Sequence, residues 1–183
     1  IPVPNVAQMQ TRAARADRPA VDLRRLVAGF LRMAPDVAVV GEVRDREALP
    51  LLLTLSSGVT GYTTIHAGSA RQALTRLRFL CQLADTSGGL PLAALNSLVS
   101  ESVDAVVHCT RTPAGPRVTE VAMVEDLTGG ADATHFTLTE VFRRPGPDQP
   151  LAWTGDVPAR AVRPLADAGY DIRALLEPRG AYG

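Results

Sequence analysis

Two short clusters of polar residues follow apolar segments of the chain, and both suit phosphate or water chemistry. The first cluster, Gly41 to Asp45, comes directly after the apolar residues 37–40. A carboxylate such as Glu42 at the end of a strand can bind a metal ion, directly or through water, or polarise an attacking water molecule. Gly41 would let the backbone turn tightly or approach a phosphate closely. The alternative is an ordinary strand before a charged helix start, with Asp45 as N-cap and Glu42 solvated.

The second cluster is Thr63-Thr64-Ile65-His66-Ala67. A histidine at the end of a strand can donate a hydrogen bond to a phosphate or respond to the state of a nucleotide. A lone histidine more often bonds the backbone, and that is the interpretation we give His108 and His135, because neither stands beside another polar candidate. Each cluster alone is therefore weak, and their combination carries the argument.

The elements that must position these clusters alternate along the chain. An amphipathic helix is predicted over residues 21–33, and Pro35 stops it. Residues 37–40 form a β-branched run typical of a strand buried on both faces in a parallel sheet. A helix over 46–55 ends at Gly58, and residues 62–65 form the next strand. Ser69 and Gln72 fit a capping box that starts another helix, with Leu74, Leu77, Cys81 and Ala84 on one face.

The pattern changes near residue 110. Pro91 suits the first position of a helix, and residues 104–109 form another apolar strand. Residues 20–110 thus predict an α/β layer with a mostly parallel core sheet. Beyond it, residues 118–124 and 135–142 are expected to pair as antiparallel strands around the Gly129-Gly130 turn, before a short helix at 159–168. We therefore expect two parts, 1–110 and 111–183.

Composition excludes several classes of function. The chain has 183 residues, 46% of them hydrophobic, and a formal net charge of zero. All 19 basic residues are arginine, so no lysine chemistry is available. The neutral balance and the absence of a basic stripe argue against direct contact with nucleic acid. Cys81 and Cys109 are expected to be free thiols. No apolar run approaches the roughly 18 residues of a membrane-spanning helix, and no signal peptide is visible.

The two clusters belong to one long ordered pattern. It runs from Arg32-Met33 and Pro35-Asp36 through the strand and Gly41-Glu42-Val43-Arg44, then through Thr63 to Ser69 and the helix carrying Arg71 and Arg76. This pattern resembles the type II/type IV secretion ATPases, most closely their CpaF-like branch of tight-adherence pilus and conjugation ATPases. The likeness is strongest over residues 20–110. It continues more weakly through residues 136–142, 162–164 and 175–176.

The resemblance implies a RecA-like P-loop NTPase core that uses ATP and Mg²⁺. It implies a homohexameric ring at the cytoplasmic face of the inner membrane, working with a membrane platform protein in pilus assembly, secretion or DNA transfer. Glu42 would be the Walker B carboxylate, His66 the His-box residue, and Arg12 an arginine that meets the phosphates at a subunit interface. The surroundings of the nucleotide and metal would be Gly41, Arg44, Asp45, Thr63 and Thr64. A salt bridge within its loop or a free surface charge is the alternative for Arg12.

The sequence departs from the family pattern in three ways. It has no G-x-x-x-x-G-K-S/T loop, whose amides and lysine hold the phosphates. The acidic box expected just before Ile1 is absent. The link from Gly58 to His66 is about one residue short, with Val59 where relatives often have histidine and Gly68 where they often have asparagine.

We therefore expect the chain, which opens without methionine, to be the C-terminal part of an ATPase and to be inactive alone. Its exported substrate stays open. The alternative is a non-catalytic ring subunit or adaptor that docks on an active ATPase or a membrane platform. A DNA-binding translocase is a third class, suggested only by analogy with conjugation systems.

Overall fold

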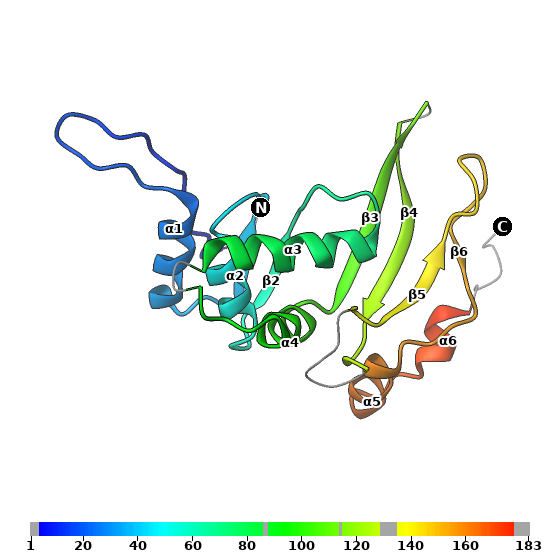
Figure 1. Cartoon of the computed structure of the whole chain (residues 1–183). Coiled ribbons are helices and arrows are strands. Elements are labelled where there is room, and N and C mark those ends of the chain that lie inside the picture. The colour runs from blue at the N-terminus through cyan, green and yellow to red at the C-terminus, as the bar shows by residue number, and fades with distance from the viewer. Residues whose placement is uncertain (1–3, 86–87, 114, 129–134, 178–183) are drawn as a thin grey trace.

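The computed structural model describes residues 4–85, 88–113, 115–128 and 135–177, which fold into helices and two small sheets (Figure 1). The helices are α1 Leu23–Phe30, α2 Ala48–Leu55, α3 Ala70–Ala84, α4 Leu92–Ser102, α5 Ala159–Asp167 and α6 Ile172–Leu176, and a 3-10 turn, η1, spans Leu31–Met33. The strands are β1 Val37–Val40, β2 Thr60–Thr63, β3 Ala105–Thr112, β4 Gly115–Val124, β5 Leu138–Arg143 and β6 Ala152–Trp153. Among the described residues, no helix has the length and apolar character needed to cross a bilayer.

The first sheet consists of β1 and β2, which pair in parallel from Val37↔Thr60 to Val40↔Thr63. Its strand at 37–40 is confirmed, whereas β2 begins two residues before the predicted 62–65. The expectation that β1 is buried on both faces is wrong. Ala38 and Val40 lie in the core, but Val37 is 50% and Val39 56% exposed. Helices cover only one face of this sheet within the described residues, so the alternate side chains remain in contact with water.

The second sheet has four strands in the order β3-β4-β5-β6, and every pairing in it is antiparallel. The expected antiparallel pairing of residues 118–124 with 135–142 is confirmed as β4 with β5, although β5 begins three residues later than predicted and Gly129-Gly130 lies outside the described residues. The mostly parallel core sheet is only partly found, because β3 pairs with β4 rather than with β1 or β2. β3 also crosses residue 110, and the division into two parts there stays a prediction.

The helices pack their apolar faces into one core. The predicted face of α3 is confirmed, since Leu74, Leu77, Cys81 and Ala84 are all buried. Both cysteines are free, as expected, and burial raises the pKa of the Cys81 thiol to about 12. Pro91 is the N-cap of α4 and not its first helical residue, because its ψ of 147° is extended. The predicted helix at 21–33 is α1 continued by η1.

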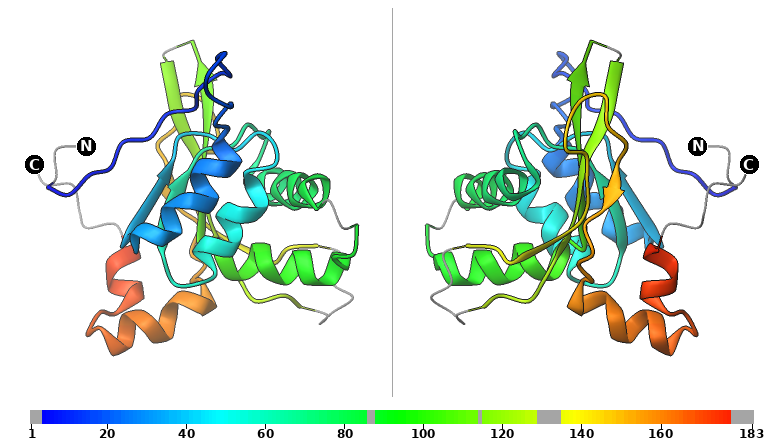
Figure 2. Two further views of the ribbon diagram at one scale, coloured as in Figure 1. Left: turned by 90° about the vertical axis from the view of Figure 1, so that its left-hand side faces the viewer. Right: turned by 90° about the vertical axis from the view of Figure 1, so that its right-hand side faces the viewer.

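Two peripheral features complete the fold. Residues 4–20 are all exposed, and the backbone bridges Arg12↔Val21 and Arg15↔Arg18 close them into an arm that projects from α1 away from the four-stranded sheet (Figure 1). The predicted helix at 159–168 is confirmed as α5. It lies beside α6, which was not predicted, at one end of the molecule (Figure 2). Neither feature belongs to the edge where β1 and β2 end.

Candidate functional site

The two polar clusters meet at the carboxyl edge of the β1–β2 sheet. Since β1 and β2 run in parallel and in register, the residues that follow them leave the sheet side by side. The Val43 amide donates to the Thr64 carbonyl at 2.9 Å, and the Thr64 hydroxyl donates to the Gly41 carbonyl at 2.6 Å. Two hydrogen bonds thus join the loop carrying Glu42 to the loop carrying His66.

Glu42 lies at the centre of this edge, and its side chain is only 21% exposed. Its Oε2 accepts a hydrogen bond from Arg44 Nη2. Its Oε1 lies 3.1 Å from His66 Nε2. That distance fits an ion pair with a protonated imidazole, but the angle is not that of a hydrogen bond, and this buried oxygen accepts none from the described residues. A buried carboxylate oxygen without a donor is suited to a water molecule or a cation.

The charges around Glu42 favour its ionised form. The hydrogen bond from Arg44 is the largest cause that lowers the pKa of Glu42, and burial opposes it. The positive charges of Arg44, His66 and Arg76 lower that pKa further. The same contact raises the pKa of Arg44. Arg76, on α3, is a contributor that we did not predict as a site residue, because nothing in its local sequence indicates how near Glu42 it lies.

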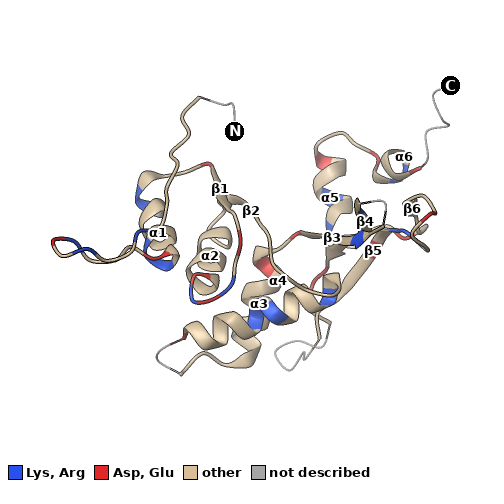
Figure 3. Cartoon of the chain, turned by 90° about the horizontal axis from the view of Figure 1, so that it is seen from above, with Lys and Arg blue, Asp and Glu red and all other residues tan. Residues whose placement is uncertain are grey.

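The loop between β1 and α2 is organised by a different acid from the one expected. Acidic and basic residues follow one another along this segment (Figure 3). Glu47 is 7% exposed, and its Oε1 accepts the backbone amides of Arg44 at 2.6 Å and Asp45 at 3.0 Å. Asp45 is therefore not the N-cap of α2, because that position is held by Glu47 and the Asp45 side chain is exposed. Glu47 was not among the predicted site residues.

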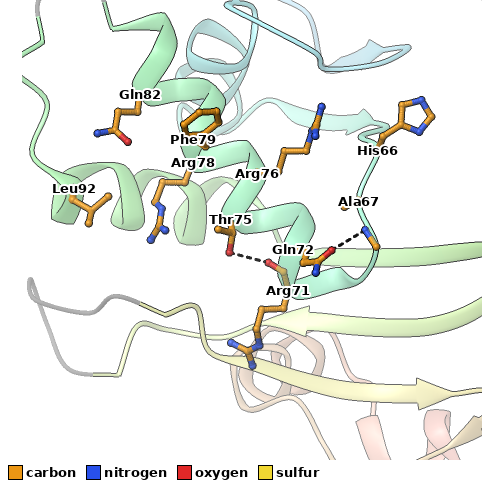
Figure 4. A pocket seen from close by; sticks show the side chains of 11 residues that line it. His66, Ala67, Arg71, Gln72, Thr75, Arg76, Arg78, Phe79, Gln82 and Leu92 are labelled. Carbon is orange, nitrogen blue, oxygen red and sulfur yellow. Dashed lines mark hydrogen bonds between the residues drawn. The ribbon is translucent and has the colours of Figure 1, made fainter.

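His66 sits on a loop that the start of α3 fixes in place, with its side chain 84% exposed. Ser69 Oγ accepts the Gln72 amide at 3.2 Å, as a capping box predicts. The reciprocal bond differs, because Gln72 Oε1 accepts the Gly68 amide at 3.1 Å in place of the Ser69 amide (Figure 4). A Cβ at Gly68 would lie 2.7 Å from Gln72 Oε1, so glycine permits this closure.

The remaining site candidates, Thr63 and Gly41, make few contacts with the described residues. Thr63 is exposed, and its hydroxyl reaches only the Thr64 carbonyl at 3.5 Å. Gly41 is exposed, its φ is not positive, and a Cβ there would meet nothing within 4 Å. The described residues therefore do not require glycine for a tight turn, and the open space above Gly41 leaves room for a phosphate to approach.

Arg12 is not brought to the other candidates. It lies on the exposed arm, where its Nη2 donates to the Pro19 carbonyl at 3.2 Å. It is absent from the charges that shift the pKa of Glu42. Within the described residues Arg12 forms no salt bridge, so its expected alternative as an internal ion pair is not supported.

The site offers one carboxylate to a metal ion. In the described part of the chain, no group of three or more His, Cys, Asp or Glu side chains is arranged to hold a cation. That donor set still fits Mg²⁺, which is commonly bound by one or two carboxylates together with substrate phosphates and water. The Oε1 of Glu42 accepts no hydrogen bond from the described residues, so it is the oxygen available to the metal ion.

Comparison with known proteins places these features in context. A family model described as "Type II/IV secretion system protein" matches residues 1–134. The conjugal transfer protein TrbB of Rhizobium radiobacter is 41% identical over 106 residues, which are 57% of this chain and 31% of that protein. The type IV secretion system protein VirB11 of Bartonella quintana is 29% identical over 122 residues, covering 66% of this chain and 34% of that protein.

A solved structure supports the same family relationship. The crystal structure of the VirB11 ATPase from the Brucella suis type IV secretion system, in complex with sulphate, matches with a TM-score of 0.52 and 28% identity. The match covers 55% of this chain and 31% of that chain. The mixed α/β fold is thus shared over about half of the sequence. The chain spans about a third of the length of the relatives it matches.

Proposed function

Because the chain belongs to the type II/IV secretion system protein family, we propose that the complete protein hydrolyses ATP to power secretion or conjugal transfer. This chain would supply the part of the site that faces the attacking water and the γ-phosphate. The observation that carries the proposal is the position of Glu42, held ionised between Arg44 and His66 at the carboxyl edge of parallel strands. A ligand crevice is expected at that edge in α/β folds.

Each residue has a distinct proposed role. Glu42 orients and polarises the water through Oε1, or holds Mg²⁺ directly or through water. Bound Mg²⁺ would neutralise the charge that develops on the phosphate oxygens. Arg44 keeps Glu42 ionised and fixes its rotamer through Oε2. His66, exposed at the next strand end, donates to the γ-phosphate and responds to its loss.

Other groups must complete the site. No lysine exists among the 183 residues, so the loop that grips the phosphates comes from outside this sequence. Arg12 is proposed to reach the phosphates of a neighbouring subunit, because its arm is exposed and Arg12 is absent from the charges that act on its own Glu42. A RecA-like core, a homohexameric ring and an inner-membrane platform protein as partner belong to the same proposal. So do the CpaF-like assignment and a location at the cytoplasmic face of that membrane. No direct contact with nucleic acid is included.

The decisive experiment replaces Glu42 in the complete protein. We expect Glu42→Gln to lower the kcat of ATP hydrolysis by about 10²- to 10⁴-fold, with little change in KM for ATP. The matched control is Glu101→Gln, because Glu101 is an exposed acid on α4. Turnover of Glu42→Gln equal to that of the control would refute the role of Glu42, provided thermal unfolding shows both variants folded.

The second candidate is a non-catalytic ring subunit or adaptor. It would hold if the complete protein, like these 183 residues, had no lysine-containing phosphate loop, since such a protein binds nucleotide weakly. It predicts that the complete protein shows no ATP turnover and that ATP does not raise its melting temperature. A melting temperature that rises with ATP concentration would exclude this candidate.

A further inference from the structure

An open groove runs along the exposed side of α3, beyond the candidate site. It measures about 810 Å³ and extends from the loop carrying His66 to Leu92 at the start of α4 (Figure 4). The residues that decide its character are Arg71, Arg76, Phe79, Gln82 and Leu92. We call this feature the α3 groove. Its open shape suits an extended surface contact and not a small molecule, which proteins usually enclose in a concave pocket.

The α3 groove is basic toward one end and apolar toward the other. Arg71 and Arg76 are exposed on the first half of α3. Phe79 is 55% exposed and Leu92 45% exposed, and the neighbouring Leu83 is 54% exposed. Phe79 and Leu83 stand four positions apart, so they share one side of the helix. Apolar side chains gathered in this way are typical of a surface that another molecule covers.

The positive charge at the basic end is not neutralised. Arg71 Nη1 donates to the Phe136 carbonyl, which is a neutral acceptor and leaves the charge in place. Arg76 forms no salt bridge within the described residues, and its positive charge acts on Glu42 by lowering the pKa of that carboxyl. No acidic residue lines the α3 groove, and α3 itself contains no Asp or Glu. A ligand with carboxylates would therefore meet the guanidinium groups of Arg71 and Arg76, with Arg78 also in the lining, and no acidic side chain.

We propose that the α3 groove binds an acidic, amphipathic segment of a partner protein. Its carboxylates would pair with Arg71 and Arg76, and its apolar side chains would cover Phe79 and Leu92. Charge complementarity at one end sets the register of such a segment, and burial at the other end supplies most of the affinity. An amphipathic helix laid into a groove is a common form of this contact.

A nucleic acid fits this groove less well. A backbone of phosphates needs a series of cations along its whole path. Beyond Arg71 and Arg76 the lining adds Arg78, whose Nη1 donates to Asn96 Oδ1, and then the apolar Phe79 and Leu92, which match no phosphate. The single exposed aromatic ring could stack one base, whereas binding of a single strand uses several such platforms. The apolar half of the groove therefore favours a polypeptide.

The test uses the complete protein and a labelled synthetic peptide. The peptide has about 14 residues, enough to lie along α3, with glutamates in one half and leucine and phenylalanine at helical spacing in the other. Fluorescence anisotropy should show saturable binding that weakens as salt is added. We expect Arg76→Glu and Phe79→Ala each to raise Kd about tenfold or more, which corresponds to roughly 1.4 kcal/mol.

Matched controls separate lost contact from lost structure. Arg111→Glu changes an exposed arginine on β3, and Tyr170→Ala removes an aromatic ring that is 57% exposed near α6. Both should leave Kd within about twofold of wild type, since neither residue lines the groove. A second peptide carries lysine in place of glutamate. It should bind wild type poorly and should regain affinity with Arg76→Glu, a rescue that a misfolded variant would not produce.

Four outcomes overturn the proposal. The first is no saturable binding of the acidic peptide, and the second is binding that Arg76→Glu and Phe79→Ala leave unchanged. A 15-nucleotide single-stranded DNA that competes with the peptide and binds more tightly would assign the groove to nucleic acid. Self-association of the chain that Phe79→Ala abolishes would assign it to a second copy. None of these readouts involves ATP, so the proposed ATPase function can stand or fall separately.

Discussion

Glu42 shows how neighbouring residues set the state of a single carboxylate. Arg44 stands two positions along the chain and donates to Oε2, while His66 approaches Oε1 from the next strand end. Glu47 holds the backbone of Arg44 and Asp45, and so fixes the direction in which Arg44 leaves the loop. These contacts favour the ionised form of Glu42 before any ligand binds. The lowering of its pKa comes chiefly from the hydrogen bond of one guanidinium group, that of Arg44.

This dependence predicts the effect of removing Arg44. The pKa of Glu42 is lowered in the folded chain, so its contact with Arg44 stabilises the fold above the unfolded pKa and is lost as pH falls through the folded pKa. Arg44→Ala should raise the pKa of Glu42, as followed by NMR of its side-chain carboxyl carbon. Arg46→Ala, at an exposed neighbouring arginine, should leave the titration unchanged. Equal titration curves for wild type and Arg44→Ala would contradict the assignment.

At the scale of elements, the sequence predicted what local pattern decides. The buried face of α3 follows from its period, and the meeting of Glu42 with His66 follows from two parallel strands that end at one edge. The pairing of β3 with β4 was missed, because an apolar strand reads alike in parallel and antiparallel surroundings. The alternative role of Asp45 as N-cap was wrong, because the helix begins after Glu47 and the Glu47 carboxylate accepts the amides of Arg44 and Asp45, a contact that only the folded loop reveals.

The docking of α5 is an element-scale feature that rests on one buried acid. Glu125 is 8% exposed, and its carboxylate accepts the amides of Ala159 at 3.0 Å and Arg160 at 2.9 Å. Thr139 donates to the same carboxylate at 2.7 Å. An anion at the start of a helix meets both its free amides and its dipole. Glu125 therefore joins β5 to α5.

Glu125→Gln should weaken this junction. The amide side chain keeps the size of glutamate, but it lacks the charge and one of the two acceptors, which we expect to cost about 1–3 kcal/mol. Urea unfolding measures the loss, and Glu101→Gln on α4 serves as the exposed control. If the junction opens before the rest of the chain, hydrogen exchange should rise first in α5 and α6. A midpoint equal to that of the control would show that α5 docks without Glu125.

At the scale of the whole molecule, the described residues include a sheet covered on one side only. Val37, Val39 and Tyr62 form an exposed apolar surface on β1 and β2, with Tyr62 64% exposed. Sheets of parallel strands are ordinarily covered on both faces, which is why the sequence predicted two-sided burial for β1. The β-branched run predicted the strand correctly and its two-sided burial wrongly, because burial depends on what lies against the sheet. The sequence of a strand does not indicate which segments pack against it.

The uncovered face predicts that the isolated chain associates with itself. Water-exposed valines on an open two-stranded sheet favour pairing with another copy, and the free strand edges add to this tendency. Static light scattering should show a mass that rises with concentration in the micromolar range. Val39→Thr should reduce this rise, because it replaces a methyl group by a hydroxyl and keeps the β-branched shape. With Val39 56% exposed, the change in folding free energy should stay within about 0.5 kcal/mol.

The control is Val162→Thr, which makes the same chemical change at a 42% exposed position on α5. It should leave the association unchanged, because Val162 lies on a helix far along the chain from the open sheet. Phe79→Ala should also leave it unchanged, since the α3 groove is a separate surface. A chain that stays monomeric at every concentration and melts cooperatively would show that the β1–β2 face does not drive association. Loss of association in Val162→Thr as well would place the contact elsewhere on the molecule.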